Sequence, residues 1–312
     1  GLHHVLDTGR YAQDSASAVF WLIATFLAAA AILKVYALDP LIAHLRRYRV
    51  TAVQRVAEKT WRMHLEPGTV RRLHFRGGQF VWLKFDRAFA RLTEHPFSIA
   101  SGPEESGRIE FLIKEAGDFT RGIGAVPRGT PAFLDGPYGN FTLVGRAGDG
   151  IMLVAGGIGV APMLSILNEL AGHHDRRPVK LVYGNRNAVQ IAARSELDAL
   201  ANQLDLEVIH VLSEPAPDWN GLRGVLDDQT LARCLPGKDR ERWLYFICGP
   251  VGMIDAVELA LDRNGIPLTQ IVSERFTYQG GLATPREILI RAALGGTFGL
   301  ILLVALSFAV LR

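Results

Sequence analysis

The tetrapeptide His95–Ser98, "HPFS", places an imidazole and a hydroxyl on either side of a proline and an aromatic ring, at what reads as the end of a strand. A turn would explain Pro96, and a hydrophobic core would explain Phe97. Neither explains the two polar side chains that flank them. Because imidazole and hydroxyl groups both exchange hydrogen bonds with ligands, HPFS is a candidate binding motif.

A glycine-rich junction between a strand and a helix follows in "LVAGGIGVAPMLS". Gly156, Gly157 and Gly159 would let the backbone approach a pyrophosphate, whose charge the free N–H groups of the helix start would favour. Pro162 is well tolerated in a first helical turn. The spacing departs from G-x-G-x-x-G, so this is not the ordinary dehydrogenase fingerprint. The alternative is that the glycines serve only to pack the helix on the strand.

A second junction of the same design, "YFICGPVGMIDAVELAL", places Cys248, Gly249, Pro250 and Met253 at the carboxyl end of a strand. Ligands of open α/β sheets bind at those ends. A small buried apolar residue is the alternative interpretation of Cys248. The chain has two cysteines in all and no CxxC spacing, which excludes a disulfide framework and a structural zinc site.

The elements that must position these motifs fall into two groups. Residues 48–145 form short predicted strands with frequent Gly and Pro, a pattern typical of a small barrel or sandwich. Residues 149–275 alternate apolar strands with helical stretches, which predicts βαβ units and a parallel sheet. The sequence therefore predicts a barrel first and a nucleotide-binding fold second.

The order of the motifs HPFS, GDFT, GPYG, AGGIGVAP, CGPVGM and SERF resembles the ferredoxin–NADP reductase superfamily, over roughly residues 48–278. The HPFS form is similar to the ferric reductase and NADPH oxidase branch, whose flavin module is attached to a haem-bearing membrane domain. The resemblance implies a six-stranded antiparallel flavin-binding barrel, then a Rossmann-like parallel-sheet NADP domain, flanked by two transmembrane helices.

The resemblance implies roles for single residues. HPFS would line the isoalloxazine of FAD, with Ser98 bonded to the flavin N5 and His95 facing the ribityl and phosphate part. Lys114 would lie near the diphosphate, although a solvated strand residue is the alternative. The implied FAD-binding residues are His95, Pro96, Phe97, Ser98, Ile99, Lys114, Gly117, Phe119 and Thr120. The implied catalytic residues are Ser98, Cys248, Glu274 and Phe276. Phe276 would cover the other flavin face; a core aromatic is the alternative.

The second predicted strand of the nucleotide-binding part ends in "LVYGNRN", where NAD-specific folds place Asp or Glu. Arg186 occupies this place, Arg194 is close in sequence, and a guanidinium suits a 2′-phosphate. NADPH is therefore favoured over NADH, with an exposed arginine at a helix start as the alternative. The candidate NADP-binding residues are Gly156, Gly157, Gly159, Pro162, Arg186, Arg194, Cys248, Gly249, Pro250 and Met253.

Apolar residues make up 49% of the 312 residues, and the excess lies at the two ends. Runs at 18–37 and 292–311 are each about as long as a bilayer requires, so we expect two membrane spans; buried core helices are the alternative. Basic residues flank both runs on the side of the central segment, which predicts that residues 40–287 are cytoplasmic. These flanks also account for the net charge of +3, so no nucleic-acid partner is expected.

The N-terminal His3 and His4 match, by the resemblance, a haem axial ligand at the end of a preceding membrane helix; a surface loop is the alternative. The chain lacks the other helices, so haem b is expected only in a longer protein. The expected segments are an extracytoplasmic end (1–14), a transmembrane helix (15–39), a linker (40–47), the barrel (48–147), the nucleotide-binding domain (148–278), and a linker with the second transmembrane helix (279–312).

We therefore expect a membrane-bound flavin oxidoreductase. It would transfer hydride from NADPH to FAD, and single electrons onward to a membrane haem domain and an acceptor such as ferric chelate or oxygen. One alternative is a reductase that serves a soluble electron-transfer protein or oxygenase. The other is a flavin-free membrane scaffold without activity. A multi-pass location in the cell membrane, lipid contacts and a homodimer through the second span are further expectations.

Overall fold

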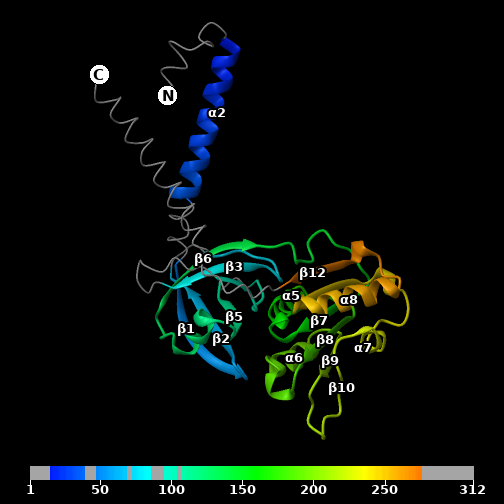
Figure 1. Ribbon diagram of the computed structural model, residues 1–312. Helices are drawn as coiled ribbons and strands as arrows, with labels where there is room; N and C mark the ends of the chain where they lie inside the picture. Colours follow the sequence, from blue (N-terminus) through cyan, green and yellow to red (C-terminus); the bar gives the residue numbers. More distant parts are fainter. Residues whose placement is uncertain (1–14, 39–46, 69–71, 86–94, 104–106, 276–312) are drawn as a thin grey trace. The chain divides into compact units, whose positions relative to one another are not determined.

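The computed structural model describes residues 15–38, 47–68, 72–85, 95–103 and 107–275. Two compact units can be distinguished: residues 46–279 form one, and the two ends of the chain form the other. The larger unit holds two sheets of six strands each, one antiparallel and one parallel (Figure 1). Each sheet carries one of the two groups of motifs.

The antiparallel sheet has the strand order β4-β3-β6-β1-β2-β5. Its strands are β1 (Arg47–Ala57), β2 (Thr60–Pro67), β3 (Phe80–Phe85), β4 (His95–Ser98), β5 (Ile109–Lys114) and β6 (Pro131–Tyr138). A bridge between Ile99 and Phe111 joins the two edges, so the sheet curls towards closure. This confirms the predicted six-stranded antiparallel barrel.

The barrel core is built from side chains that alternate along the strands, as a sheet with one buried face requires. Tyr48 and Val50 on β1, and Met63 and Leu65 on β2, are at most 1% exposed. The buried Tyr48 hydroxyl accepts a hydrogen bond from the N–H of Leu73 at 2.9 Å, so its polar end is satisfied. Between β5 and β6 lie the short helices α4 (Asp118–Arg121) and η2 (Ile123–Ala125).

The parallel sheet has the order β10-β9-β8-β7-β11-β12. Its strands are β7 (Ile151–Gly156), β8 (Val179–Asn185), β9 (Leu206–Leu212), β10 (Leu222–Arg223), β11 (Leu244–Gly249) and β12 (Ile271–Arg275). The helices between them are η3 (Gly157–Gly159), α5 (Val160–Gly172), η4 (Ala188–Gln190), α6 (Arg194–Ala201), α7 (Asp228–Ala232), η5 (Arg240–Arg242), α8 (Val251–Arg263) and η6 (Leu268–Gln270).

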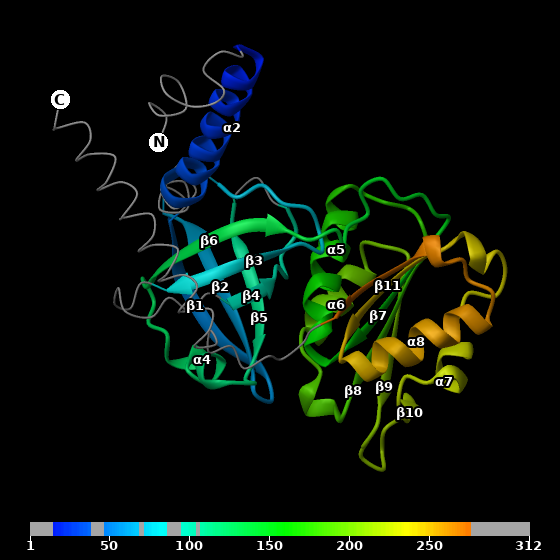
Figure 2. The ribbon, with the colours of Figure 1, turned by 45° about the horizontal axis from the view of Figure 1, so that its top comes forward.

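Helices cover both faces of the parallel sheet, as Figure 2 shows. On β7, Leu153 and Ala155 pack in one cluster with α5 and α6, whereas Met152 and Val154 pack in another with α7 and α8. All six residues of β7 and of β11 are buried. Strands buried on both faces read as continuous apolar runs, which is why the sequence predicted a parallel sheet here.

The first apolar run forms α2 (Ser15–Leu33), followed by the π-helical turn η1 (Lys34–Leu38). Among the helices of the described residues, none is both long and apolar enough to cross a bilayer. The α-helix stops at Leu33, four residues before the expected span does. The membrane span expected at 18–37 is therefore not supported. The second expected span, at 292–311, lies outside the described residues.

Candidate active site

Ser98 is the last residue of β4 and lies opposite Phe80 on β3. The residue is only 5% exposed, and its Oγ has no hydrogen-bond partner among the described residues. Leaving a buried hydroxyl unpaired costs about 1–3 kcal/mol, so such an atom needs an explanation. A ligand that hydrogen-bonds Oγ provides one, which fits the binding role expected of HPFS.

The remaining polar member of HPFS stacks on an aromatic group. The His95 ring lies 4.1 Å from that of Phe119 on α4, and Phe97 lies 6.1 Å from the same ring. Burial lowers the pKa of His95, which favours the neutral imidazole. The structure thus brings HPFS and GDFT, which are about 20 residues apart, to one place.

The GDFT turn is stabilised by hydrogen bonds between its own side-chain and backbone groups. The Thr120 hydroxyl accepts hydrogen bonds from the N–H groups of Ala116 and Gly117 at 2.8 and 2.9 Å. The resemblance implied that the Gly117 N–H and the Thr120 hydroxyl face the diphosphate, whereas here they bond each other and shape the turn. Around Gly117 the space that a side chain would take is open, with no atom of a described residue within 4 Å. The turn therefore leaves room for a ligand beside its backbone.

Lys114 leaves the end of β5 towards the other domain. Its Nζ is the nearest atom to the position that a Cβ would take on Gly157, at 4.0 Å. Gly157 has φ +54°, a conformation that glycine adopts without strain. The ammonium group of Lys114 thus lies at the glycine turn of the parallel sheet, where the sequence predicts a pyrophosphate.

Three other glycines of the two junctions are required by packing. A Cβ on Gly156 would lie 2.5 Å from the sulfur of Met253, and one on Gly159 only 2.1 Å from the carbonyl oxygen of Cys248. A Cβ on Gly249 would lie 3.1 Å from the Gly156 backbone. The packing alternative therefore holds for these three glycines, whereas Gly157 and Gly252 keep open space. Pro162 is buried in the first turn of α5, and Pro250 precedes α8 as its N-cap.

Cys248 and Glu274 are register partners on β11 and β12. Burial raises the pKa of the Glu274 carboxyl to about 7, and its Oε2 has no hydrogen-bond partner among the described residues. Burial, and then the charge of Glu274, raise the pKa of the Cys248 thiol well above its usual range. The site therefore holds a carboxyl that gains and loses its proton near neutral pH, beside a thiol that stays protonated.

Glu274 reaches the barrel at the turn that follows β6. Its Oε1 lies 3.9 Å from the position that a Cβ would take on Gly139, and a ring carbon of Phe80 lies 3.2 Å from the same position. Phe80 is also the register partner of Ser98. Ser98 and Glu274, one from each domain, thus lie at the same domain junction, and each has a polar atom without a partner among the described residues.

The part of the site expected to bind the 2′-phosphate of NADPH lies at the carboxyl ends of β8 and β9. Arg186 donates from Nε to Glu214 Oε1 at 2.9 Å, and the N–H of Glu214 donates to the carbonyl of Arg186 at 2.7 Å. The Arg194 guanidinium lies 5.9 Å from the ring centre of Trp219. One polar atom each of Asn185, Asn187 and His210 is buried there without a hydrogen-bond partner in the described part of the chain.

Glu214 was not predicted from the sequence, because NAD-specific folds place the acid directly after the second strand. The signal was in the register: Asn185 lies opposite Leu212, so the residues after β9 return beside Arg186. An acid therefore does accompany the arginine, although it comes from the neighbouring strand.

Three expected site residues lie outside the described residues: Phe276, His3 and His4. Within the described part of the chain, no three His, Cys, Asp or Glu residues are grouped to hold a metal ion. Ile99 is fully buried in the barrel core, and its N–H donates to the carbonyl of Gln79.

The groups present fit a flavin and a nicotinamide nucleotide. The orphaned Ser98 hydroxyl and the open backbone at Gly117 suit FAD in the barrel. The open glycine turn at Gly157, with Lys114 beside it, suits a diphosphate in the second domain.

Comparisons with known proteins agree with this division. Residues 46–142 match an FAD-binding domain, and residues 153–259 match an oxidoreductase NAD-binding domain. The reductase component of propane 2-monooxygenase from Mycolicibacterium goodii is 30% identical over 240 residues, which cover 74% of this chain and 67% of that protein. NADH-cytochrome b5 reductase 1 of Laccaria bicolor is 31% identical over 173 residues, 54% of this chain and 56% of the relative. The chain therefore spans little more than half of that relative.

Solved structures show the same likeness. The cytochrome P450 reductase GcoB of Amycolatopsis superposes with a TM-score of 0.66 at 25% identity, over 74% of this chain and 70% of that one. The CS-b5R domains of human Ncb5or, in the NAD⁺ form, give 0.64 at 29% identity, over 73% and 68%. The chain belongs to the pyridine-nucleotide-dependent FAD oxidoreductases that pair a ferredoxin–NADP reductase-type FAD-binding domain with an NAD-binding domain.

Proposed function

We propose that this flavin oxidoreductase takes hydride from NADPH and passes single electrons to a haem domain in a membrane. The observation that carries the enzymatic part is the pair of orphaned groups, Ser98 Oγ and Glu274 Oε2, contributed by the two domains to one junction. A flavin-free scaffold, one of the alternatives from the sequence, does not agree with membership of this enzyme family.

FAD, when bound, supplies the chemistry that accepts a hydride and releases electrons one at a time. The chain supplies position and charge. Ser98 offers a hydroxyl that no described residue binds and that a ligand can bind, and Lys114 places a positive charge at the glycine turn. Burial raises the pKa of Glu274 to about 7, so its carboxyl can hold or release a proton near neutral pH.

The preference for NADPH rests on Arg186. Glu214 engages only the Nε of this guanidinium, and no hydrogen bond from its terminal nitrogens to a described residue is present. Two parallel donors therefore remain for a 2′-phosphate. The Glu214 carboxylate opposes a phosphate at the same place, so the preference is a balance between the two charges.

The haem acceptor and the membrane location rest on the sequence: HPFS, the apolar runs and their basic flanks. Exposed apolar side chains on α2 also support an apolar neighbour, since Ile23, Phe26 and Leu27 are 54%, 72% and 60% exposed. A second candidate acceptor is a soluble oxygenase component, favoured by the 30% identity to the reductase component of propane 2-monooxygenase.

The test is anaerobic mixing of the FAD-loaded full chain with NADPH, followed by absorbance near 450 nm. Rapid bleaching is expected, and a flavin that NADPH and NADH leave oxidised would refute the proposal. The reduced protein is then offered membranes that contain b-type haem or a soluble iron–sulfur oxygenase partner. Haem reduction without transfer to the soluble partner supports the membrane acceptor, and the opposite result supports the second candidate.

A further inference from the structure

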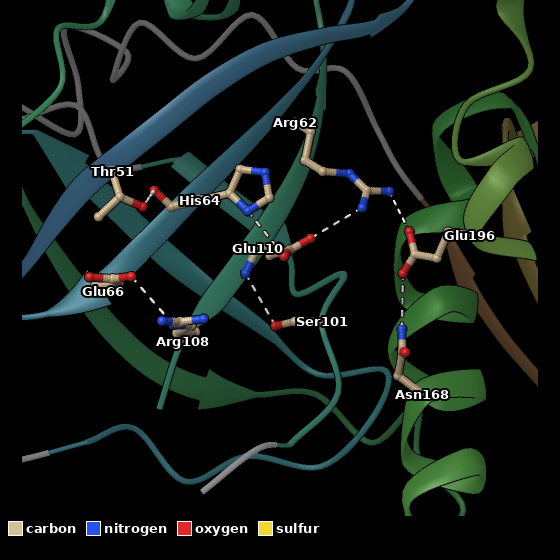
Figure 3. A network of polar contacts seen from close by, with 9 residues as sticks. All are labelled: Thr51, Arg62, His64, Glu66, Ser101, Arg108, Glu110, Asn168 and Glu196. Carbon is tan, nitrogen blue, oxygen red and sulfur yellow. Dashed lines mark hydrogen bonds and ion pairs between the residues drawn. The ribbon is translucent and has the colours of Figure 1, made fainter. Parts of the chain in front are cut away.

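Arg62 on β2 forms an ionic link between the two domains. Its Nη1 lies 3.3 Å from Glu110 Oε2 on β5 of the barrel, and its Nη2 donates to Glu196 Oε2 on α6 of the NAD-binding domain (Figure 3). The side chains are 17%, 29% and 24% exposed, so the pairs are shielded better than most surface ion pairs. Arg62 Nε is buried without a partner among the described residues, which leaves the guanidinium held by these carboxylates.

Each carboxylate is fixed within its own domain by its second oxygen. Glu110 Oε1 lies 3.0 Å from His64 Nδ1 on β2. Glu196 Oε1 accepts a hydrogen bond from Asn168 Nδ2 on α5 at 3.1 Å. Both acceptors are therefore oriented independently of Arg62, and the planar guanidinium spans two prepared positions.

Other contacts also join the domains, through side chains as well as backbone groups. Arg76 Nη1 lies 3.6 Å from Glu169 Oε1, and Gln190 Nε2 donates to Glu58 Oε2 at 2.9 Å. The N–H of Gly77 donates to Glu169 Oε2 at 2.9 Å, and the Ser165 hydroxyl donates to the carbonyl of Ser101 at 2.7 Å. These contacts remain when Arg62 is replaced. Losing the ionic link is therefore expected to change the angle between the domains, rather than to separate them.

We propose that Arg62 is a positioning residue for hydride transfer: it sets how closely the nicotinamide held by one domain approaches the flavin held by the other. The inference rests on the proposed function. Hydride transfer needs reacting atoms about 3–3.5 Å apart, and a misplacement of about 1 Å costs on the order of 100-fold in rate. The two reactants are bound by different domains, so the contacts that fix the domains control this distance.

The experiment compares Arg62→Ala, Arg62→Lys and Glu196→Ala in the FAD-loaded full chain. The matched control is Arg108→Ala, because Arg108 pairs with Glu66 at 3.3 Å and both residues belong to the barrel. Measurements are flavin content, the limiting rate of flavin reduction at saturating nicotinamide nucleotide, the dissociation constant of that nucleotide, and reoxidation of dithionite-reduced flavin by ferricyanide.

Arg62→Ala and Glu196→Ala are expected to slow the limiting reduction rate by about 10- to 100-fold, with flavin content, nucleotide affinity and reoxidation within about twofold of the unmodified protein. Arg62→Lys is expected to be faster than Arg62→Ala but slower than the unmodified protein, because lysine keeps the positive charge and lacks the planar guanidinium that binds both carboxylates. A protein that carries both Arg62→Ala and Glu196→Ala is expected to be no slower than the slower of the two single variants, because both remove the same contact.

The inference is overturned if both alanine variants reduce as fast as Arg108→Ala, or if rate and nucleotide affinity fall together. If Arg62→Ala fails to fold, Glu196→Ala decides the question from the other domain. An unmodified protein that no nicotinamide nucleotide reduces would instead refute the proposed function.

Discussion

The raised pKa of the Glu274 carboxyl makes the free energy of unfolding depend on pH. Burial raises this pKa from an ordinary value of 4.5 to about 7. Between these two values the folded protein holds a proton that the unfolded chain has released. The contribution to stability is therefore fully present below pH 4.5 and is lost as the pH rises through 7. A shift of one pKa unit corresponds to about 1.4 kcal/mol, so the loss amounts to about 3 kcal/mol.

Replacing Glu274 with Gln removes the titration, because an amide does not ionise and has nearly the same shape. The free energy of unfolding would be measured with urea at several pH values from 4.5 to 8, at equal flavin occupancy for both proteins. The unmodified protein should lose about 3 kcal/mol relative to the variant across this range. The comparison cancels the titrations that the two proteins share.

The matched control is Glu207→Gln, since Glu207 is a carboxylate on β9 with 57% of its side chain exposed. Its profile should run parallel to that of the unmodified protein. If the Glu274→Gln profile also runs parallel, the carboxyl is not held protonated by burial, and its role as a proton store near neutral pH is wrong.

The remaining predictions concern three other features. Ser98→Ala should slow flavin reduction while flavin content stays near normal, because one hydrogen bond is worth about 1 kcal/mol; stopped-flow absorbance checks this, and loss of flavin would contradict it. Arg186→Ala should raise KM for NADPH far more than for NADH, and Glu214→Gln should lower it; equal effects on the two nucleotides would assign the pair a structural role. Gly159→Ala should destabilise the protein by about 1–3 kcal/mol or more, whereas Gly172→Ala, with open space at its Cβ, should change the melting temperature little.

The division into barrel and parallel sheet was predictable because both depend on local patterns. Alternation along β1 and β2 and the continuous apolar runs of β7 and β11 carry the fold class in the sequence itself. The strand-end motifs were predictable as well, since turns and glycines mark where strands end.

Contacts distant in sequence were not predictable. Arg62 and Glu196 are 134 residues apart, and each reads as an ordinary charged surface residue. The same holds for Glu214, whose place beside Arg186 depends on strand order. Packing decided the meaning of Gly156 and Gly159, which sequence could not separate from phosphate binding.

The contacts of α5 with the barrel have an asymmetry that matters for exchanging domains. On α5, the side chains of Glu169 and Ser165 form these hydrogen bonds. On the barrel, their partners are backbone groups, the N–H of Gly77 for Glu169 and the carbonyl of Ser101 for Ser165. Main-chain groups are common to all sequences, so compatibility at these points is encoded almost wholly in one helix. The barrel's own requirement is a small residue at 77, because a Cβ there would lie 2.8 Å from Glu169 Oε2. A chimaera that joins this nucleotide-binding domain to a foreign barrel would therefore need a matching loop shape at these points, a counterpart of Arg62, and partners for the other side chains that cross the boundary, such as Gln190.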